Sequence, residues 1–123
     1  MADLERRILI AEDVEENRHA LKLLLKLSGY ASLEAADGRA AVEIALREKP
    51  ELVLMDLSLP ELDGFGAVRE LRAAGAKVPI IIVSAYDDPE TRARAQAAGA
   101  NDYVTKPLDF DQLRQRIAAL LAA

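Results

Sequence analysis

The chain alternates between short apolar runs and longer segments in which apolar residues recur at helical spacing. Three of the runs are continuous, which is typical of strands that are covered on both faces of a parallel sheet. They are residues 8–11, 52–55 and 80–83. Two other runs, residues 31–36 and 103–104, are interrupted or flanked by polar residues, which predicts strands at the edges of the sheet.

Each apolar run is followed by a segment whose amphipathic pattern predicts a helix. Asp88 followed by Pro89 is typical of an N-cap with proline at the first helical position. The alanine-rich fourth helix has the weakest apolar stripe, and we expect it to be the least firmly packed. The predicted helices cover residues 14–28, 39–48, 64–75, 89–99 and 110–121.

Alternation of strands and helices implies right-handed crossovers and a parallel sheet with helices on both faces. Edge positions for the second and fifth strands predict a doubly wound α/β fold with strand order 2-1-3-4-5. The 123 residues suit one domain, and no linker, repeat or low-complexity segment divides them. We therefore expect a single domain over residues 1–123.

The composition excludes several kinds of protein. Hydrophobic residues make up 51% and charged residues 30% of the chain, which is typical of a globular domain. The absence of cysteine excludes disulfides, thiolate nucleophiles and cysteine-based zinc sites. A net charge of -5 without a long basic run argues against nucleic acid as a partner. Because no stretch resembles a membrane span or a signal peptide, we expect a cytoplasmic protein without a membrane partner.

Chemically reactive side chains follow the predicted strands at one edge of the sheet. In open parallel sheets the functional crevice lies beyond the carboxyl ends of the strands. The residues found there are Glu12 and Asp13 where the first strand ends, Asp56 at the end of the third, Ser84 at the end of the fourth and Lys106 after the fifth. Three carboxylates, a hydroxyl and an ammonium therefore converge on one rim.

This convergence of carboxylates is unfavourable unless a cation offsets it. Two unit charges about 5 Å apart repel by roughly 3 kcal/mol at an effective dielectric near 20. One lysine cannot balance three carboxylates, and oxygen ligands without histidine or cysteine favour Mg2+ over zinc. A carboxylate beside Mg2+ and Lys106 stays ionised and can attack a phosphoryl group in line, while Ser84 can hydrogen-bond the new phosphate.

Each of these residues also has an ordinary structural interpretation. Asp13 and Glu16 have the spacing of a capping box, with Asp13 as the N-cap of the first helix. Alone, Asp56 could begin a loop, Ser84 could be a polar strand end, and Lys106 could be a solvated surface residue. Their convergence from separate segments on one end of the sheet favours the functional interpretation.

The chemically reactive segments together resemble the signature of two-component response-regulator receiver domains, over essentially the whole chain. The resemblance implies a CheY-like, flavodoxin-like (βα)5 fold. The matching residues are Glu12-Asp13, Met55-Asp56-Leu57 with Pro60 and Asp63-Gly64, Ser84-Ala85 and Lys106-Pro107.

The resemblance implies that Asp56 accepts a phosphoryl group from a phosphohistidine of a histidine kinase or a histidine phosphotransfer protein. It also implies a Mg2+ site in which Asp13, Asp56 and the carbonyl of Ser58 bind directly, and Glu12 acts through a metal-bound water. The residues that respond to the phosphate would be Ser84, Ala85, Lys106 and Tyr103, with a cis peptide bond before Pro107.

By the same resemblance, phosphorylation would change a protein-binding surface formed by the fourth helix, fifth strand and fifth helix. Tyr103 would rotate inward in response, although plain packing on an edge strand also explains a tyrosine there. Such a protein is a self-dephosphorylating switch rather than a turnover enzyme.

Two other functions compete with this hypothesis. A phosphorylation-independent interaction module could share the fold, but such modules usually lose one of the acidic or lysine positions, and this chain retains them all. A flavodoxin-like enzyme or nucleotide binder would need a phosphate-cradling loop, and no GxGxxG or Walker-type motif is present.

Overall fold

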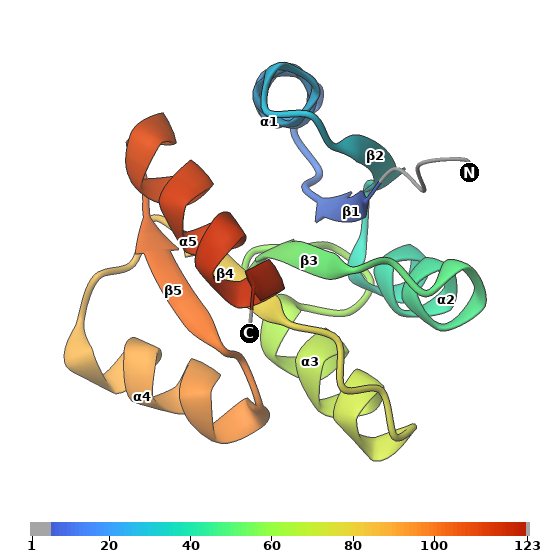
Figure 1. Ribbon diagram of the computed structural model, residues 1–123. Helices are drawn as coiled ribbons and strands as arrows, with labels where there is room; N and C mark the ends of the chain where they lie inside the picture. The colour runs from blue at the N-terminus through green and yellow to red at the C-terminus, as the bar shows by residue number, and fades with distance from the viewer. Residues whose placement is uncertain (1–5, 123) are drawn as a thin grey trace.

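The computed structural model describes residues 6–122 and shows a five-stranded parallel sheet with helices on both faces (Figure 1). The sheet has the order β2-β1-β3-β4-β5, and every neighbouring pair is parallel. The predicted doubly wound fold is confirmed, with β2 and β5 at the edges. The strands are β1 (Arg7–Ala11), β2 (Ala31–Ala35), β3 (Leu52–Asp56), β4 (Ile80–Ser84) and β5 (Asp102–Thr105).

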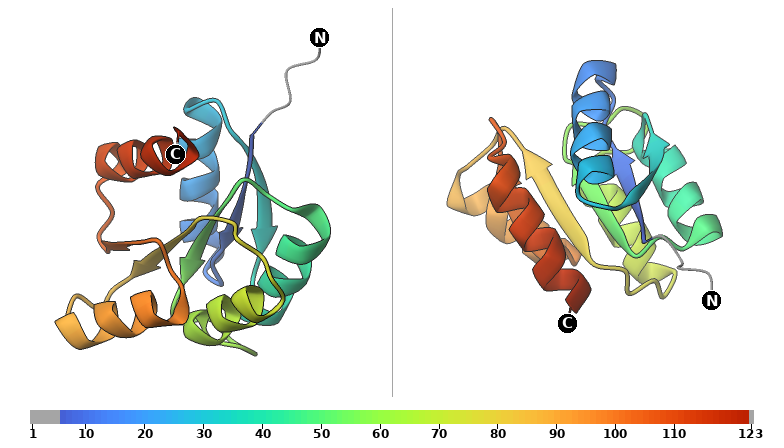
Figure 2. Two further views of the ribbon diagram at one scale, coloured as in Figure 1. Left: turned by 60° about the horizontal axis from the view of Figure 1, so that its bottom comes forward. Right: turned by 45° about the horizontal axis from the view of Figure 1, so that its top comes forward.

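The helices form two layers, with α1 and α5 on one face of the sheet and α2, α3 and α4 on the other (Figure 2). Alternate residues of each central strand point to opposite layers, as the period of a strand requires. Ile8 and Ile10 pack with α1 and α5, whereas Leu9 packs under the other three helices. The helices are α1 (Glu15–Leu27), α2 (Gly38–Glu48), α3 (Gly64–Ala73), α4 (Pro89–Ala98) and α5 (Phe110–Ala122).

Helix α4 buries little apolar surface, and two cation–π contacts join it to its neighbours. Its only buried residue is Ala95, in agreement with the weak apolar stripe of its sequence. The guanidinium of Arg92 lies 4.7 Å from the centre of the Tyr103 ring, and that of Arg94 lies 4.0 Å from the centre of the Phe65 ring. Across residues 6–122, none of the helices combines the length and the apolarity that a membrane span needs.

The start of α1 differs from the predicted capping box. Val14, and not Asp13, occupies the N-cap position, and no side chain caps it. The Val14 N–H instead donates to Glu12 Oε2 over 2.9 Å. The capping-box interpretation of Asp13 is therefore wrong, because the acidic group that bonds the first turn comes from the strand end before it.

The third and fourth strands end where the sequence predicts, and this places two residues of the site. Asp56 is the last residue of β3, and Ser84 is the last residue of β4. Both side chains are therefore placed by sheet hydrogen bonds rather than by a loop. The predicted cap of α4 is confirmed, since the Asp88 carboxylate accepts the N–H of Thr91 over 2.9 Å.

Candidate functional site

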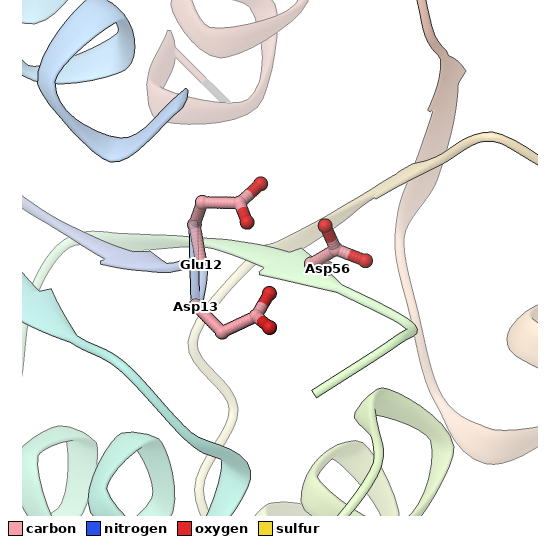
Figure 3. A group of neighbouring side chains, drawn as sticks. All are labelled: Glu12, Asp13 and Asp56. Atoms are coloured by element: carbon pink, nitrogen blue, oxygen red, sulfur yellow. The ribbon is translucent and has the colours of Figure 1, made fainter. Parts of the chain in front are cut away.

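Three carboxyl groups gather at the carboxyl ends of β1 and β3 (Figure 3). Glu12 and Asp13 follow β1 directly, and Asp56 ends β3. One carboxylate oxygen from each residue lies within 4.8 Å of the other two. Glu12 and Asp56 are buried, while Asp13 is exposed. The grouping predicted from the strand ends is therefore present, with one member open to solvent.

Lys106 bridges the two buried carboxylates. Its Nζ lies 2.7 Å from Asp56 Oδ2 and 3.1 Å from Glu12 Oε1. Burial alone would lower the pKa of Lys106, but the hydrogen bonds and charges of Asp56 and Glu12 outweigh it and raise that pKa. Lys106 is therefore a charged partner of the site and not a solvated surface residue.

The charges of the site do not balance. When ionised, three carboxylates and one ammonium leave a formal charge of about -2, and carboxylates within 4.8 Å repel by about 3 kcal/mol at an effective dielectric near 20. Burial raises the pKa of Glu12, hydrogen bonds from Val14 and Lys106 oppose the rise, and nearby Asp56 adds to it. The oxygen-only donor set and the missing two charges fit a hard divalent cation such as Mg2+.

Asp56 is held by the loop that follows it. Its Oδ1 accepts the N–H of Ser58 over 2.8 Å. The loop returns close to the strand at Gly64, where an added Cβ would lie 2.4 Å from the carbonyl oxygen of Asp56. Ser58 itself is exposed beside the carboxylates, and the use of its carbonyl as a metal ligand stays a prediction.

Ser84 and Tyr103 both meet the backbone of Tyr86. The Ser84 hydroxyl oxygen accepts the Tyr86 N–H over 3.0 Å, and the Tyr103 hydroxyl donates to the Tyr86 carbonyl over 2.6 Å. Within residues 6–122, none of the hydrogen bonds of Ser84 reaches Asp56. Ala85, which lies between Ser84 and Tyr86 in the sequence, is exposed.

The Tyr103 ring lies inward in this structure. It is 8% exposed and belongs to the apolar cluster under α2, α3 and α4, and its rotation in response to phosphorylation stays a prediction. The sequence suggested an edge residue because β5 has sheet pairing on one side only. The ring is nevertheless covered, because α4 and the Arg92 side chain pack over it.

A cavity of about 350 Å3 opens beside the acidic cluster, between α1 and the segment that joins β5 to α5. Glu12 and Lys106 line it next to the carboxylates, and most of its remaining lining is apolar. The Lys106–Pro107 peptide bond is cis, as expected. Residues that line the rest of the cavity include Ala20, Leu21, Pro107, Leu108 and Phe110.

Arg18 is a neighbour of the site that the sequence pattern did not reveal. Its Nη1 donates to the carbonyl oxygen of Glu12 over 3.0 Å, and its Nε donates to Glu34 Oε1 over 3.0 Å. The sequence placed Arg18 on the polar face of the first helix, yet only 17% of its side chain is exposed. The available signal was Glu34, an acidic residue in an otherwise largely apolar edge strand.

Comparison with known proteins gives consistent matches along the chain. A family model described as response regulator receiver domain matches residues 8–118. The response regulator MprA of Mycolicibacterium vanbaalenii is 36% identical over 115 residues, which cover 94% of this chain and 50% of that protein. The chain therefore spans half the length of this relative.

Two solved structures extend the comparison. The receiver domain of the sensor histidine kinase PA1611 from Pseudomonas aeruginosa PAO1, with a magnesium ion coordinated in its active-site cleft, is 35% identical with a TM-score of 0.90; the match covers 98% of this chain and 100% of that one. A LuxR-family DNA-binding response regulator from Staphylococcus aureus is 25% identical with a TM-score of 0.88, and the match covers 94% and 98% of the two chains. Because some relatives are DNA-binding regulators, the absence of a nucleic-acid partner stays a prediction.

Proposed function

The chain belongs to the response regulator receiver domain family, and on this premise we propose that Asp56 accepts a phosphoryl group in a Mg2+-dependent reaction and thereby switches a protein-binding surface. The observation that carries the proposal is the position of the Asp56 carboxylate. It is buried at a strand end, bonded to Lys106, and next to two further carboxylates whose charge is not balanced by protein groups.

Asp13 and Asp56 would hold the metal directly, with the Ser58 carbonyl as a further proposed ligand, and Glu12 would hold it through a metal-bound water. When bound, Mg2+ would offset the missing positive charge and stabilise negative charge on the phosphoryl oxygens. The solved receiver with magnesium in its cleft supports this assignment by similarity.

The proposed chemistry is a single transfer to a carboxylate. One Asp56 oxygen attacks phosphorus, the bond from phosphorus to a histidine nitrogen of the donor protein breaks with its electron pair left on that nitrogen, and the imidazole leaves, taking up a proton from solvent. Lys106, which contacts Asp56 Oδ2, then pairs with an oxygen of the new phosphate. Hydrolysis of the acyl phosphate returns the free carboxylate and inorganic phosphate, so the protein acts as a switch rather than as a turnover enzyme.

The donor protein must cover the rim where Asp56 lies. We propose a histidine kinase or a histidine phosphotransfer protein, which are the donors that the family implies. The apolar cavity between α1 and the β5–α5 segment supports a protein donor, because it is lined by Lys106 and by Phe110, which is 44% exposed. An exposed aromatic side chain beside the reactive rim provides contact area that a small phosphodonor does not need.

The proposed output passes through Tyr86. The Ser84 hydroxyl oxygen accepts the Tyr86 N–H and the Tyr103 hydroxyl holds the carbonyl of the same residue, so we propose that Ser84 turns toward the phosphate and shifts Tyr86 with it. Movement of Ser84 therefore displaces the segment that leads into α4, and it alters the α4–β5–α5 surface that would contact the downstream protein.

Labelling with acetyl phosphate in Mg2+ tests the proposal. Here acetate leaves as the Asp56 oxygen bonds to phosphorus, and mass spectrometry detects the added phosphoryl group. We expect labelling of the wild type and none of Asp56→Asn. Asp63→Asn is the matched control, because its side chain caps α3 through Gly66 and an asparagine can still do so.

Undiminished labelling of Asp56→Asn would overturn the assignment of the acceptor. Absence of labelling in the wild type, together with no Mg2+-dependent change in the NMR spectrum near Asp56, would favour a phosphorylation-independent interaction module instead.

A further inference from the structure

We propose that Arg18 is a positioning residue for the magnesium site, because its guanidinium fixes the peptide unit that joins Glu12 to Asp13. The inference rests on the proposed function, in which these two residues bind the metal. The guanidinium of Arg18 hydrogen-bonds the Glu12 carbonyl and Glu34, and none of the three carboxylates of the cluster. It would act through the backbone that carries the Glu12 and Asp13 side chains.

The direction of the Asp13 side chain depends on its backbone. Among the described residues, no hydrogen bond holds the exposed Asp13 carboxylate, so nothing but the main chain aims it at the cluster. Two peptide units flank its Cα atom. Arg18 Nη1 bonds the carbonyl of the first unit, and Glu12 Oε2 bonds the N–H of the second, which belongs to Val14. Each unit is thereby held by one hydrogen bond, and Arg18 supplies one of the two.

Arg18 can do this because its own side chain is fixed. Its Nε donates to Glu34 Oε1 on the edge strand β2, and Lys22 holds the other oxygen of Glu34 over 3.3 Å. The planar guanidinium presents donors in a rigid fork, so one side chain reaches a carboxylate and a carbonyl together. A lysine has a single nitrogen at its end and cannot reproduce this pair of contacts with the same geometry.

A simpler role for Arg18 would be to tie α1 to β2 without any effect on the metal. The two roles predict opposite changes in Mg2+ affinity when Arg18 is replaced. Removing a positive charge near a cation site strengthens cation binding by Coulomb's law. Releasing the Glu12–Asp13 peptide weakens it, because the ligand oxygens are no longer held in place before the metal binds. A loss of affinity in a variant that also loses a positive charge would therefore be opposite to the electrostatic expectation.

The experiment compares Arg18→Gln with Lys22→Gln in a Mg2+ titration followed through the backbone amide NMR signals of Asp13 and Ser58. Lys22→Gln is the matched control, since it removes a positive charge and a Glu34 contact from the same helix but leaves the bond to the Glu12 carbonyl. Outer-shell changes at metal sites typically lower affinity 10–100-fold. We expect Arg18→Gln to weaken Mg2+ binding about tenfold, and Lys22→Gln to leave it unchanged or slightly strengthened.

Arg18→Lys separates geometry from charge, because it keeps the positive charge and loses the two fixed donor groups of the guanidinium. We expect it also to weaken Mg2+ binding, by several-fold, and it decides the question if Arg18→Gln does not fold. In acetyl phosphate labelling, both variants should need more Mg2+ to reach half of the maximal rate, while the rate at saturating Mg2+ stays near that of the wild type.

Mg2+ affinity equal to or tighter than that of the wild type in folded Arg18→Gln or Arg18→Lys would overturn the inference. Equal weakening by Lys22→Gln would overturn it as well, because the effect would then not depend on the Glu12 carbonyl. Failure of the wild type to bind Mg2+ would instead overturn the proposed function, so the two failures are distinct.

Discussion

Replacement of Lys106 by methionine removes the ammonium that contacts both Asp56 and Glu12 and keeps a side chain of similar length. Asp56 is 5% exposed and Glu12 is 2% exposed, so neither carboxylate can recover its full hydration. In the metal-free protein the two negative charges then face one another without a cation. We expect the folded state to be destabilised mainly by these unpaired charges.

The size of the effect follows from the geometry. Breaking a buried ion pair by removing one partner costs about 3–5 kcal/mol. The Lys106 side chain is 27% exposed, so water reaches part of the pair and the lower end of this range applies. Repulsion between carboxylates within 4.8 Å is also about 3 kcal/mol at an effective dielectric near 20. We therefore expect a loss of about 3 kcal/mol in the free energy of unfolding.

Urea unfolding in the presence of a chelator measures this loss, and repeating it in Mg2+ tests its origin. The variant site carries one more uncompensated negative charge, so it should bind Mg2+ more tightly than the wild type does. A ligand that binds only the folded state stabilises it in proportion to its affinity. The deficit of Lys106→Met should therefore shrink by at least about 1 kcal/mol in excess Mg2+.

Lys22→Met is the control, because this exposed lysine pairs with Glu34 over 3.3 Å at the surface. It should change stability by less than about 1 kcal/mol, with or without Mg2+. The electrostatic account would be refuted if Lys106→Met were as stable as the wild type in chelator. An equal deficit with and without Mg2+ would also contradict it, since lost packing would then explain the change.

Three further predictions follow from other parts of the structure. Gly38→Ala should destabilise the fold by about 2 kcal/mol or more in chemical denaturation, because the new Cβ would lie 1.6 Å from the carbonyl oxygen of Leu62; unchanged stability would contradict this packing. Burial would raise the pKa of Glu34, but hydrogen bonds from two basic side chains of α1 hold it below the ordinary 4.5. The stabilisation of the folded state by ionised Glu34 is present above pH 4.5 and lost as the pH falls through the lowered pKa. The free energy of unfolding should therefore fall less steeply with decreasing pH in Glu34→Gln than in the wild type. Arg92→Met should remove a cation–π contact worth about 0.5–1 kcal/mol, and iodide should then quench the fluorescence of Tyr103 more strongly than in the wild type. Identical quenching would show that the Arg92 guanidinium does not shield the ring.

The sheet and its reactive edge were predictable because both depend on patterns that are local in sequence. Three continuous apolar runs identified β1, β3 and β4 as central strands. Parallel strands have their carboxyl ends on one side, so the residues after them had to converge. Glu12, Asp13, Asp56 and Lys106 were brought together by this rule alone, before any distance was known.

The start of α1, the state of Tyr103 and the contacts of Arg18 depend on residues distant in the sequence, and local patterns did not predict them. Asp13 has the spacing of an N-cap, but the carboxylate of Glu12 competes for the same turn and bonds the Val14 N–H. Tyr103 is buried by a helix that its own strand does not specify. Arg18 reaches a strand that begins after its own helix has ended.

In the proposed switch, the weak attachment of α4 sets how much free energy a signal from Asp56 would have to supply. Ala95 is the one buried residue of this helix, and each of its cation–π contacts contributes about 0.5–1 kcal/mol at a partly exposed site. New charge-assisted hydrogen bonds from Ser84 and Lys106 to a phosphate would contribute about 1.5–3 kcal/mol each. Two such bonds are therefore comparable to or stronger than the two cation–π contacts of the helix. Because a ligand shifts an equilibrium only by its differential interaction with two states, a firmly packed α4 would resist this signal. An α4 without a broad apolar face can respond to it.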